Sequence, residues 1–385
     1  MNRLMNRNRS SICLMILAMV CLSPLLPLAN ELGAQTTLLR GKLRPKMITP
    51  TAEKTIQKAL AYLAKAQGKD GCWDDSGQGS SYPMAMTSLA GVGFLAGGNT
   101  PESGKYSRNV RRAMNYVLNV AEQNWKAGDK ACLISGKGNE MRSMYGHGFA
   151  MLFLAQCYGM EGNKESKRGK RIKRVLDGAV QLTVQSQSDI GAAKKHAGGW
   201  TYSATSKSDE ASVTVTQLQA LRACRNVGIK VPKKAIDRAV LLLIYLQQRD
   251  GGISYSSRSR GSSMPSLSAA AMVSFYMAGI YDDRTGGAGA EAKMVEKLAV
   301  YCNKRCQPTN SSGHFFYTQL YMAQAMYQRS GADWEKYFPV IRERLIKMQG
   351  RNGEWNGDSI GRIYGTSIAL IILQLPYGYL PIAQR

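Results

Sequence analysis

Seven carboxylates lie in or beside short glycine- and aromatic-rich segments, and paired carboxylates are the groups that cleave glycosidic bonds. One of the pair acts as general acid and the other as base or nucleophile. The carboxylates are Asp74, Asp75, Glu140, Asp209, Glu210, Glu354 and Asp358. Aromatic side chains that could stack on sugars are Trp73, Trp200, Tyr202 and Trp355. The tryptophans occupy a repeated turn position, however, which favours a role in fastening helical hairpins together.

Three imidazoles form another set with chemical potential, because three histidines can hold a zinc ion. The chain has three histidines, His147, His196 and His314. We expect separate, hydrogen-bonded histidines instead, and cysteines at zinc-finger spacing are absent. The sequence also has no Gly-x-Ser-x-Gly nucleophile elbow and no Cys-Gly-Glu-Gln thioester motif. We therefore predict no metal and no cofactor.

A recurring segment must position these residues. An apolar helix ends in glutamine, a glycine–aromatic turn follows, and a helix of small residues comes next. The turn segments are Gln67–Trp73, Gly198–Tyr202, Gln247–Tyr255 and Gln349–Trp355. Self-similarity at intervals of several tens of residues predicts a repeat architecture, in which each unit buries its apolar face against its neighbours.

Apolar periodicity and glycine-rich stops predict six pairs of helices. The first helix of each pair carries charge, whereas the second is nearly uncharged and rich in Ala, Gly, Ser and Met, so we expect an outer and an inner ring. An all-α, six-hairpin α/α toroid follows, with an open solenoid as the alternative. The apolar tail 376–381 favours closure. The expected pairs are 51–66 with 84–96, 109–121 with 142–158, 172–187 with 210–225, 234–248 with 265–278, 291–303 with 315–329, and 338–348 with 362–375.

Such a toroid would bring the N-termini of its inner helices to one rim of a central funnel. Unpaired N–H groups there favour anions. We expect ligand-binding side chains at this rim, above an apolar funnel. They are His147, Trp200, Tyr202, His314, Tyr317, Tyr364, Arg142 and Arg362.

The turn segments resemble the repeats of the terpenoid cyclase and protein prenyltransferase superfamily, whose members are six-hairpin toroids. The resemblance covers roughly residues 50 to 375, although the second and fifth hairpins lack a clean turn motif. The segments Met144–Ala150, Tyr364–Leu370 and Leu375–Pro381 further resemble an exported bacterial branch of squalene-cyclase-like proteins, known for prenyltransferase and squalene oxidase repeats.

Cyclases of this family protonate an alkene with an Asp-x-Asp-Asp-Thr motif after a Gly-Gly-Trp turn. The resemblance implies that Glu210 holds the position of the protonating acid, beside Asp209, while Ser208 and Ala211 replace the other two acids. The family acid draws its strength from a carboxyl cluster that this chain does not rebuild. We therefore favour a structural role, in which Ser208 or Asp209 caps the inner helix and Glu210 complements its dipole.

Protein prenyltransferases hold zinc with an Asp, a Cys and a His. His314 resembles the position of that histidine, but the turn Gly251–Tyr255 offers neither the Asp nor the Cys. This departure argues against a transferase of that type.

The first 29 residues have the pattern of a secretory signal peptide, since three arginines precede an apolar run that ends at Ala29. A retained anchor is the alternative, which Pro24 and Pro27 disfavour. We expect a mobile segment at 30–49 and the toroid at 50–385. The protein would be exported to the periplasm, the extracellular space or the cell envelope, with no membrane span after removal of the signal. Export permits disulfides, and Cys72 with Cys132 is the favoured pair.

The net charge of +25 (51 basic minus 26 acidic side chains) favours anionic partners such as envelope polymers. Much of this charge lies in Lys164–Arg174, which we interpret as a solvated basic loop leading into a helix. No motif supports binding of nucleic acid.

These features predict an exported repeat protein that binds a hydrophobic or amphiphilic small molecule, isoprenoid or lipid-like, in its funnel without cyclase activity. The alternatives are an isoprenoid cyclase or transferase that uses Glu210 as acid, an envelope interaction scaffold, and a polysaccharide-active toroid.

Overall fold

The protein is described here from a computed structural model that covers residues 44–75, 81–126, 128–135, 142–189, 197–282, 286–310 and 313–383. The predicted signal peptide, Glu140 and His196 lie outside these residues. The chain divides at Pro45, and all that follows concerns the unit that begins at Lys46.

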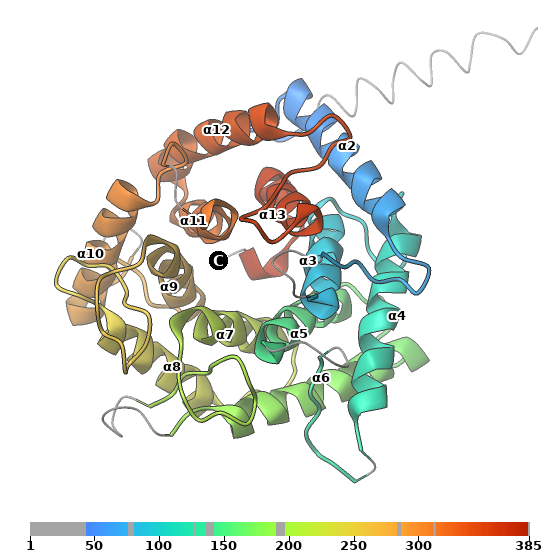
Figure 1. The fold of residues 1–385 in the computed structure, drawn as a ribbon, viewed down its shortest axis with the longest axis horizontal. Helices are drawn as coiled ribbons and strands as arrows, with labels where there is room; N and C mark the ends of the chain where they lie inside the picture. The colour runs from blue at the N-terminus through green and yellow to red at the C-terminus, as the bar shows by residue number, and fades with distance from the viewer. Residues whose placement is uncertain are drawn as a thin grey trace, which may run out of the picture. The chain divides into compact units, whose positions relative to one another are not determined.

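Two concentric rings of α-helices surround one axis (Figure 1). The outer ring consists of α2 (Pro50–Ala66), α4 (Ser107–Asn124), α6 (Lys167–Ser186), α8 (Lys233–Leu246), α10 (Gly289–Arg305) and α12 (Gly331–Met348). The inner ring consists of α3 (Pro83–Ala96), α5 (Ser143–Gly159), α7 (Ala211–Asn226), α9 (Pro265–Met277), α11 (Phe315–Arg329) and α13 (Arg362–Gln374). The described residues form no β-strand, only isolated bridges.

The inner ring is closed. Each inner helix packs against the next, α13 returns to α3, and in the outer ring α12 contacts α2. This confirms the predicted all-α toroid and excludes the open solenoid. None of the helices in the described part of the chain is long and apolar enough to cross a membrane.

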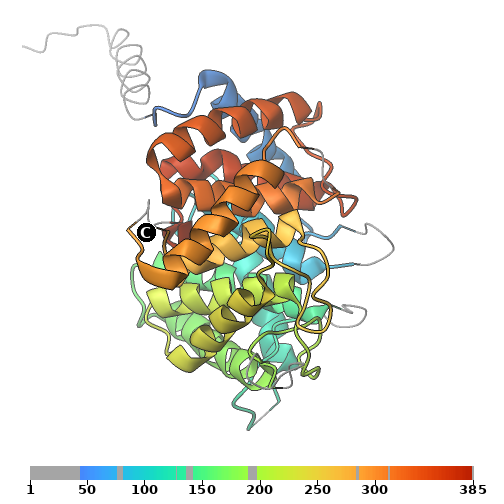
Figure 2. The same ribbon diagram turned by 90° about the vertical axis from the view of Figure 1, so that its left-hand side faces the viewer.

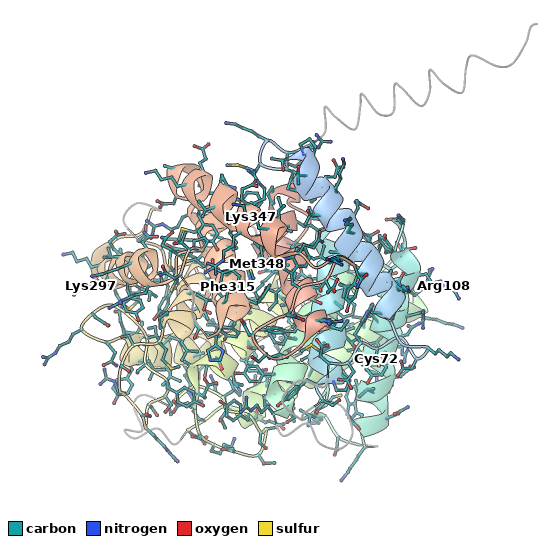
Figure 3. The ribbon with its side chains drawn as sticks, turned by 45° about the horizontal axis from the view of Figure 1, so that its top comes forward. Cys72, Arg108, Lys297, Phe315, Lys347 and Met348 are labelled. Atoms are coloured by element: carbon teal, nitrogen blue, oxygen red, sulfur yellow. The ribbon has the colours of Figure 1, made fainter. Side chains whose placement is uncertain are left out.

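The two rings follow from the distribution of charge between the helices. Every residue of α9 from Ser266 to Met277 is buried, and this stretch carries no charged side chain. In α4 only a stripe of apolar residues is buried, and its exposed face carries basic residues such as Arg108. Arg108 and, on α10, Lys297 lie on opposite sides of the outer surface (Figure 3). The amphipathic helices therefore form the outer ring, and the uncharged helices form the inner ring that they enclose.

A glutamine at the end of an outer helix holds each recognisable turn to the following hairpin. Its amide nitrogen donates both to a glycine carbonyl in its own turn and to a carbonyl in the next outer helix. The acceptors are Gly71 (2.8 Å) and Asn109 (3.0 Å) for Gln67, Gly198 (2.7 Å) and Ala235 (2.8 Å) for Gln187, Gly251 (3.0 Å) and Met294 (2.9 Å) for Gln247, and Gly353 (3.1 Å) and Thr55 (2.9 Å) for Gln349. The last of these joins the end of the repeat to its beginning.

The glycine in such a turn is required by close approach as well as by conformation. Gly353 has φ +99°, and a Cβ there would lie 2.6 Å from the carbonyl oxygen of Lys58 on α2. A larger residue would therefore push the sixth turn away from the first helix.

The turn tryptophans fasten the two helices of their own hairpin. The indole N–H donates to a carbonyl of the outer helix, and a threonine hydroxyl of the inner helix accepts from the tryptophan backbone N–H. The pairs are Leu63 and Thr87 for Trp73, Thr183 and Thr214 for Trp200, and Leu345 and Thr366 for Trp355. These tryptophans are at most 1% exposed, so their position is structural.

The second and fifth hairpins use other residues at the place of this threonine. In the second hairpin, the N–H of Ile134 donates to Nδ1 of His147 at 3.1 Å. In the fifth, Gln319 donates to the carbonyl of Cys306 at 3.0 Å. The fold therefore continues through both hairpins although their turn motif is absent.

The C-terminal tail covers the end of the inner ring opposite the turns (Figure 2). Its two short 3₁₀ helices, η4 (Leu375–Tyr377) and η5 (Pro381–Ala383), bury Leu375 and Ile382. The second contacts α7 and α11, and the N–H of Ile382 donates to Gln156 near the end of α5. The tail is thus docked, as the sequence predicted.

Three local predictions need correction. The basic segment is mostly helical, since α6 begins at Lys167. The stretch expected to be mobile is packed at its end, where Ile48 is 3% exposed and Thr49 caps α2. Cys72 and Cys132 are free thiols, because Cys132 packs against Gly178 of α6 while Cys72 lies in the first turn.

We expect Gln187→Ala to lower the free energy of unfolding by about 2 kcal/mol, because two buried carbonyls lose their donor. Gln187 is 4% exposed. The matched control is Gln185→Ala, which removes an exposed amide from the same helix. Denaturant unfolding of both variants measures the difference, and equal midpoints would contradict the role given to the turn glutamine.

Candidate functional site

A cavity of about 500 Å³ opens at the turn face of the inner ring. It is lined at the N-terminal ends of the inner helices, including the N-cap residues Tyr82, Arg142, Glu210, Met264 and His314. The turns thus deliver the inner N-termini to the mouth of one funnel, which was the geometry expected from the repeat.

The deeper wall of the cavity is apolar. Five of the inner helices contribute aliphatic or aromatic side chains, and α7 instead contributes the hydroxyl of Ser212. The apolar residues are Ala85, Met86, Leu89, Phe149, Leu267, Leu320 and Ile368.

Glu210 lines the cavity but is turned back onto its own helix. Its Oε1 accepts from the N–H of Ser212 at 3.1 Å, and its Oε2 accepts from the N–H of Val213 at 2.9 Å and from the Ser212 hydroxyl at 2.6 Å. Burial raises the pKa of Glu210, while these hydrogen bonds and the nearby Arg142 act in the opposite direction. Glu210 is therefore the N-cap of α7, a role that the sequence assigned to Ser208 or Asp209.

Two further carboxylates cap inner helices of other hairpins. Asp358, from the sixth turn, accepts from the N–H groups of Phe316 and Tyr317 at the start of α11, both at 3.0 Å. Asp75, from the first turn, accepts from the N–H of Tyr364 in α13 at 2.8 Å. Burial raises the pKa of both carboxyls. Three of the six inner N-termini are therefore occupied by acids of the chain itself, and the expected anion-attracting rim is neutralised at these three.

Hydrogen-bonded tyrosines form the polar side of the mouth near α7. The hydroxyl of Tyr145 contacts that of Ser212, which in turn donates to Glu210. The hydroxyls of Tyr202 and Tyr255 lie 2.5 Å apart. The Arg142 guanidinium lies 4.8 Å from the centre of the Tyr202 ring.

The structure brings most of the predicted site residues together. Glu210, Arg142, Tyr202, His314, Tyr317 and Tyr364 line the cavity.

Four predicted residues lie outside this lining. Trp200 is enclosed within its hairpin, Asp209 accepts from the N–H of Ser257 at 2.7 Å, and Arg362 is exposed on the rim. His147 points away from the axis, toward α6, where its Nε2 lies 3.0 Å from the Thr183 hydroxyl. These positions correct the prediction, because each side chain except that of Arg362 is held by contacts within the wall of the ring.

The burial and the pKa of His147 also indicate a structural role. Its side chain is fully buried, and burial lowers its pKa from 6.5 to about 4. It is neutral at physiological pH and bridges a turn N–H to the outer helix. Among the described residues, no cluster of three or more His, Cys, Asp or Glu side chains is arranged to hold a metal ion.

Sequence reasoning missed several cavity residues, mainly Tyr82, Tyr145, Tyr255 and Ser212. A signal was present, because every hairpin carries a tyrosine either in the turn before its inner helix or at the start of that helix. Tyr145, Tyr317 and Tyr364 are each the third residue of an inner helix.

Comparison with solved structures supports the fold. The type II terpene cyclase MstE from Scytonema, in a D109N variant complexed with geranylgeranyl dihydroxybenzoate, has a TM-score of 0.55 at 14% identity, covering 86% of this chain and 98% of its own. A family 76 glycoside hydrolase from a bovine Bacteroides thetaiotaomicron strain has a TM-score of 0.60 at 13% identity, covering 86% and 79%. The family 76 mannosidase Bt3792 from Bacteroides thetaiotaomicron has a TM-score of 0.58 at 12% identity, covering 86% and 99%.

At these identities the similarity concerns the toroid fold alone. No known sequence family matches the chain, and comparison with curated proteins gives no match.

We expect acidification to destabilise the protein through His147. Between pH 6.5 and about 4 the unfolded chain binds a proton that the folded chain does not, so stability falls as the pH falls. The shift corresponds to a loss of about 3 kcal/mol across this interval. His147→Thr, which introduces the residue found at this position in the first, third and sixth hairpins, should remove this dependence.

The measurement is the free energy of unfolding at several pH values for wild type, His147→Thr and the control His314→Thr, which removes an exposed imidazole. If wild type and His147→Thr show the same pH profile, the assignment of His147 is wrong.

Proposed function

We propose that this chain is an exported, squalene-cyclase-like repeat protein that binds an isoprenoid or lipid-like ligand in its central cavity without cyclising it. The observation that carries this proposal is the wall of the cavity, which is mostly apolar beneath a polar mouth. Burial of an apolar ligand surface supplies the main driving force for binding in such a site.

The size of the cavity suits the body of such a ligand. At about 30 Å³ for each water-sized group, 500 Å³ corresponds to roughly 17 such groups. An isoprenoid segment of on the order of 15 carbon atoms would fill it. The complex of MstE with geranylgeranyl dihydroxybenzoate is consistent with a prenyl ligand in a toroid of this fold.

The environment of Glu210 argues against cyclase chemistry. A carboxylic acid that protonates an alkene must direct an O–H toward the ligand. Both oxygens of Glu210 instead accept hydrogen bonds from the first turn of α7, which favours the ionised form.

Acid catalysis on an isoprenoid is the second candidate, because hydrogen bonds connect Glu210 through Ser212 to Tyr145. Because Ser212 donates to Glu210, transfer of a proton from Glu210 to the cavity along this path would require the hydroxyls of Ser212 and Tyr145 to reorient. Protonation followed by proton loss would convert a linear polyprenyl alkene into an isomer of equal mass.

Chromatography of a polyprenyl alkene incubated with the protein tests this candidate. Acid catalysis by Glu210 predicts that an isomer forms with wild-type protein and that none forms with Glu210→Gln, which has no carboxyl proton. Absence of the isomer with wild type, or unchanged conversion by Glu210→Gln, would exclude it.

The polysaccharide alternative receives less support from the described residues. Glu210 and Asp358 both line the cavity, but the oxygens of each already serve as helix caps. A glycosidase needs a protonated oxygen directed at the scissile bond.

The scaffold alternative depends on the basic surface, part of which is internally compensated. Arg168 pairs with Glu161 at 2.6 Å, Arg171 with Glu122 at 2.6 Å, and Lys173 with Asp177 at 2.7 Å. Anionic envelope polymers therefore remain a prediction, which salt-sensitive binding would test.

We expect Ala85→Phe to remove co-purifying lipid from the exported protein, because the phenyl ring would occupy the cavity that Ala85 lines. Ala61→Phe makes the same change on the exposed face of α2 and should retain the ligand. Native mass spectrometry with lipid extraction measures occupancy, and thermal unfolding confirms that both variants fold. Wild-type protein with no lipid above a control extract would contradict the proposal.

A further inference from the structure

Six tyrosines belong to the lining of the cavity, one from each hairpin. They come from the turn before α3, the start of α5, the turns before α7 and α9, and the starts of α11 and α13. In that order they are Tyr82, Tyr145, Tyr202, Tyr255, Tyr317 and Tyr364. Tyr255 is 37% exposed and Tyr202 is half-buried, so their hydroxyls lie where the polar end of a ligand would leave the cavity, whereas the hydroxyl of Tyr317 is buried.

Phenol groups at this place can form hydrogen bonds without supplying charge. In the Tyr202–Tyr255 pair, one hydroxyl donates to the other, so the accepting hydroxyl keeps its own hydrogen for a further partner. The oxygen atoms also have remaining lone pairs. The rings of Tyr145 and Tyr202, whose centres are 5.9 Å apart, add flat surface beside these hydroxyls.

Two carboxylates and one guanidinium line the cavity. Glu210 and Asp358 cap α7 and α11, and Arg142 lies over the ring of Tyr202. His314 also belongs to the lining and lies beside Asp358. An anionic head group would meet Arg142 only together with these two carboxylates, and a charged group of either sign would lose hydration at this mouth.

We propose that the six tyrosines of the cavity lining recognise a neutral, hydroxyl-rich head group, such as a sugar or other polyol, attached to the apolar body of the ligand. This inference rests on the proposed binding function and names the ligand class of the same cavity. It differs from the anionic head group that the helix N-termini suggested, because Asp75, Glu210 and Asp358 occupy three of those N-termini.

Four probes with the same eight-carbon chain separate the contribution of the head group. They are octyl glucoside, octanol, octanoate and octyltrimethylammonium, each titrated calorimetrically below its micelle concentration into the exported protein. We expect octyl glucoside to bind at least fivefold more tightly than the other three, as one additional net hydrogen bond would provide.

The double variant Tyr202→Phe/Tyr255→Phe keeps both rings and removes both hydroxyls. This variant should bind octyl glucoside about tenfold more weakly than wild type, and its affinity for octanol should stay within twofold of the wild-type value. Tyr327→Phe, whose ring packs against Trp334 outside the cavity lining, is the control and should change neither probe.

The outcomes separate the two proposals. Tightest binding of octanoate or octyltrimethylammonium, or an unchanged affinity of the double variant for octyl glucoside, would overturn the head-group inference and leave apolar binding intact. If none of the four probes binds wild type, the proposed function itself fails.

Discussion

The hydrogen bonds of the turn glutamines are the interaction on which the ring depends. Each amide joins a local turn to the next outer helix, so the angle between hairpins is fixed where the chain passes from the outer to the inner ring. The hydrogen bond from Gln349 to the carbonyl of Thr55 is the same contact, and it joins the last hairpin to the first helix. Because the turns also lead into the inner helices, this contact positions the cavity residues of the four hairpins that carry it.

Hairpins that lack the motif show which part of it is replaceable. A turn N–H buried between two helices needs an acceptor, and a threonine hydroxyl, a serine hydroxyl or the His147 imidazole can provide one. An imidazole is larger than a hydroxyl and reaches the outer helix as well. In the second hairpin this acceptor position therefore carries a titratable imidazole, whose contacts lie within the wall of the ring.

Much of the fold could be predicted from the sequence, because charge and small-residue content differ between the helices of each pair. The position of Tyr202 in the cavity also followed from the turn motif. The caps could not be predicted in the same way. Asp75 lies 289 residues from Tyr364, so only ring closure brings it to α13, and Asp358 lies 41 residues from Tyr317 and reaches α11 through packing of the sixth hairpin against the fifth. His147 was misplaced because a histidine at a helix start has the same local pattern whether it faces the axis or the wall.

The capping carboxylates also determine what the cavity can accept. An unoccupied ring of helix N-termini would present converging positive ends to a ligand and favour an anion. Here Glu210 and Asp358 place negative charge at two of these ends within the cavity lining, and Asp75 does so at a third. A carboxylate held by backbone N–H groups stabilises its helix only while it stays ionised, which opposes its use as a proton donor. The same three contacts thus reduce the attraction for anions and weaken the case for acid catalysis, so apolar burial and phenol hydrogen bonds become the main interactions offered to a ligand.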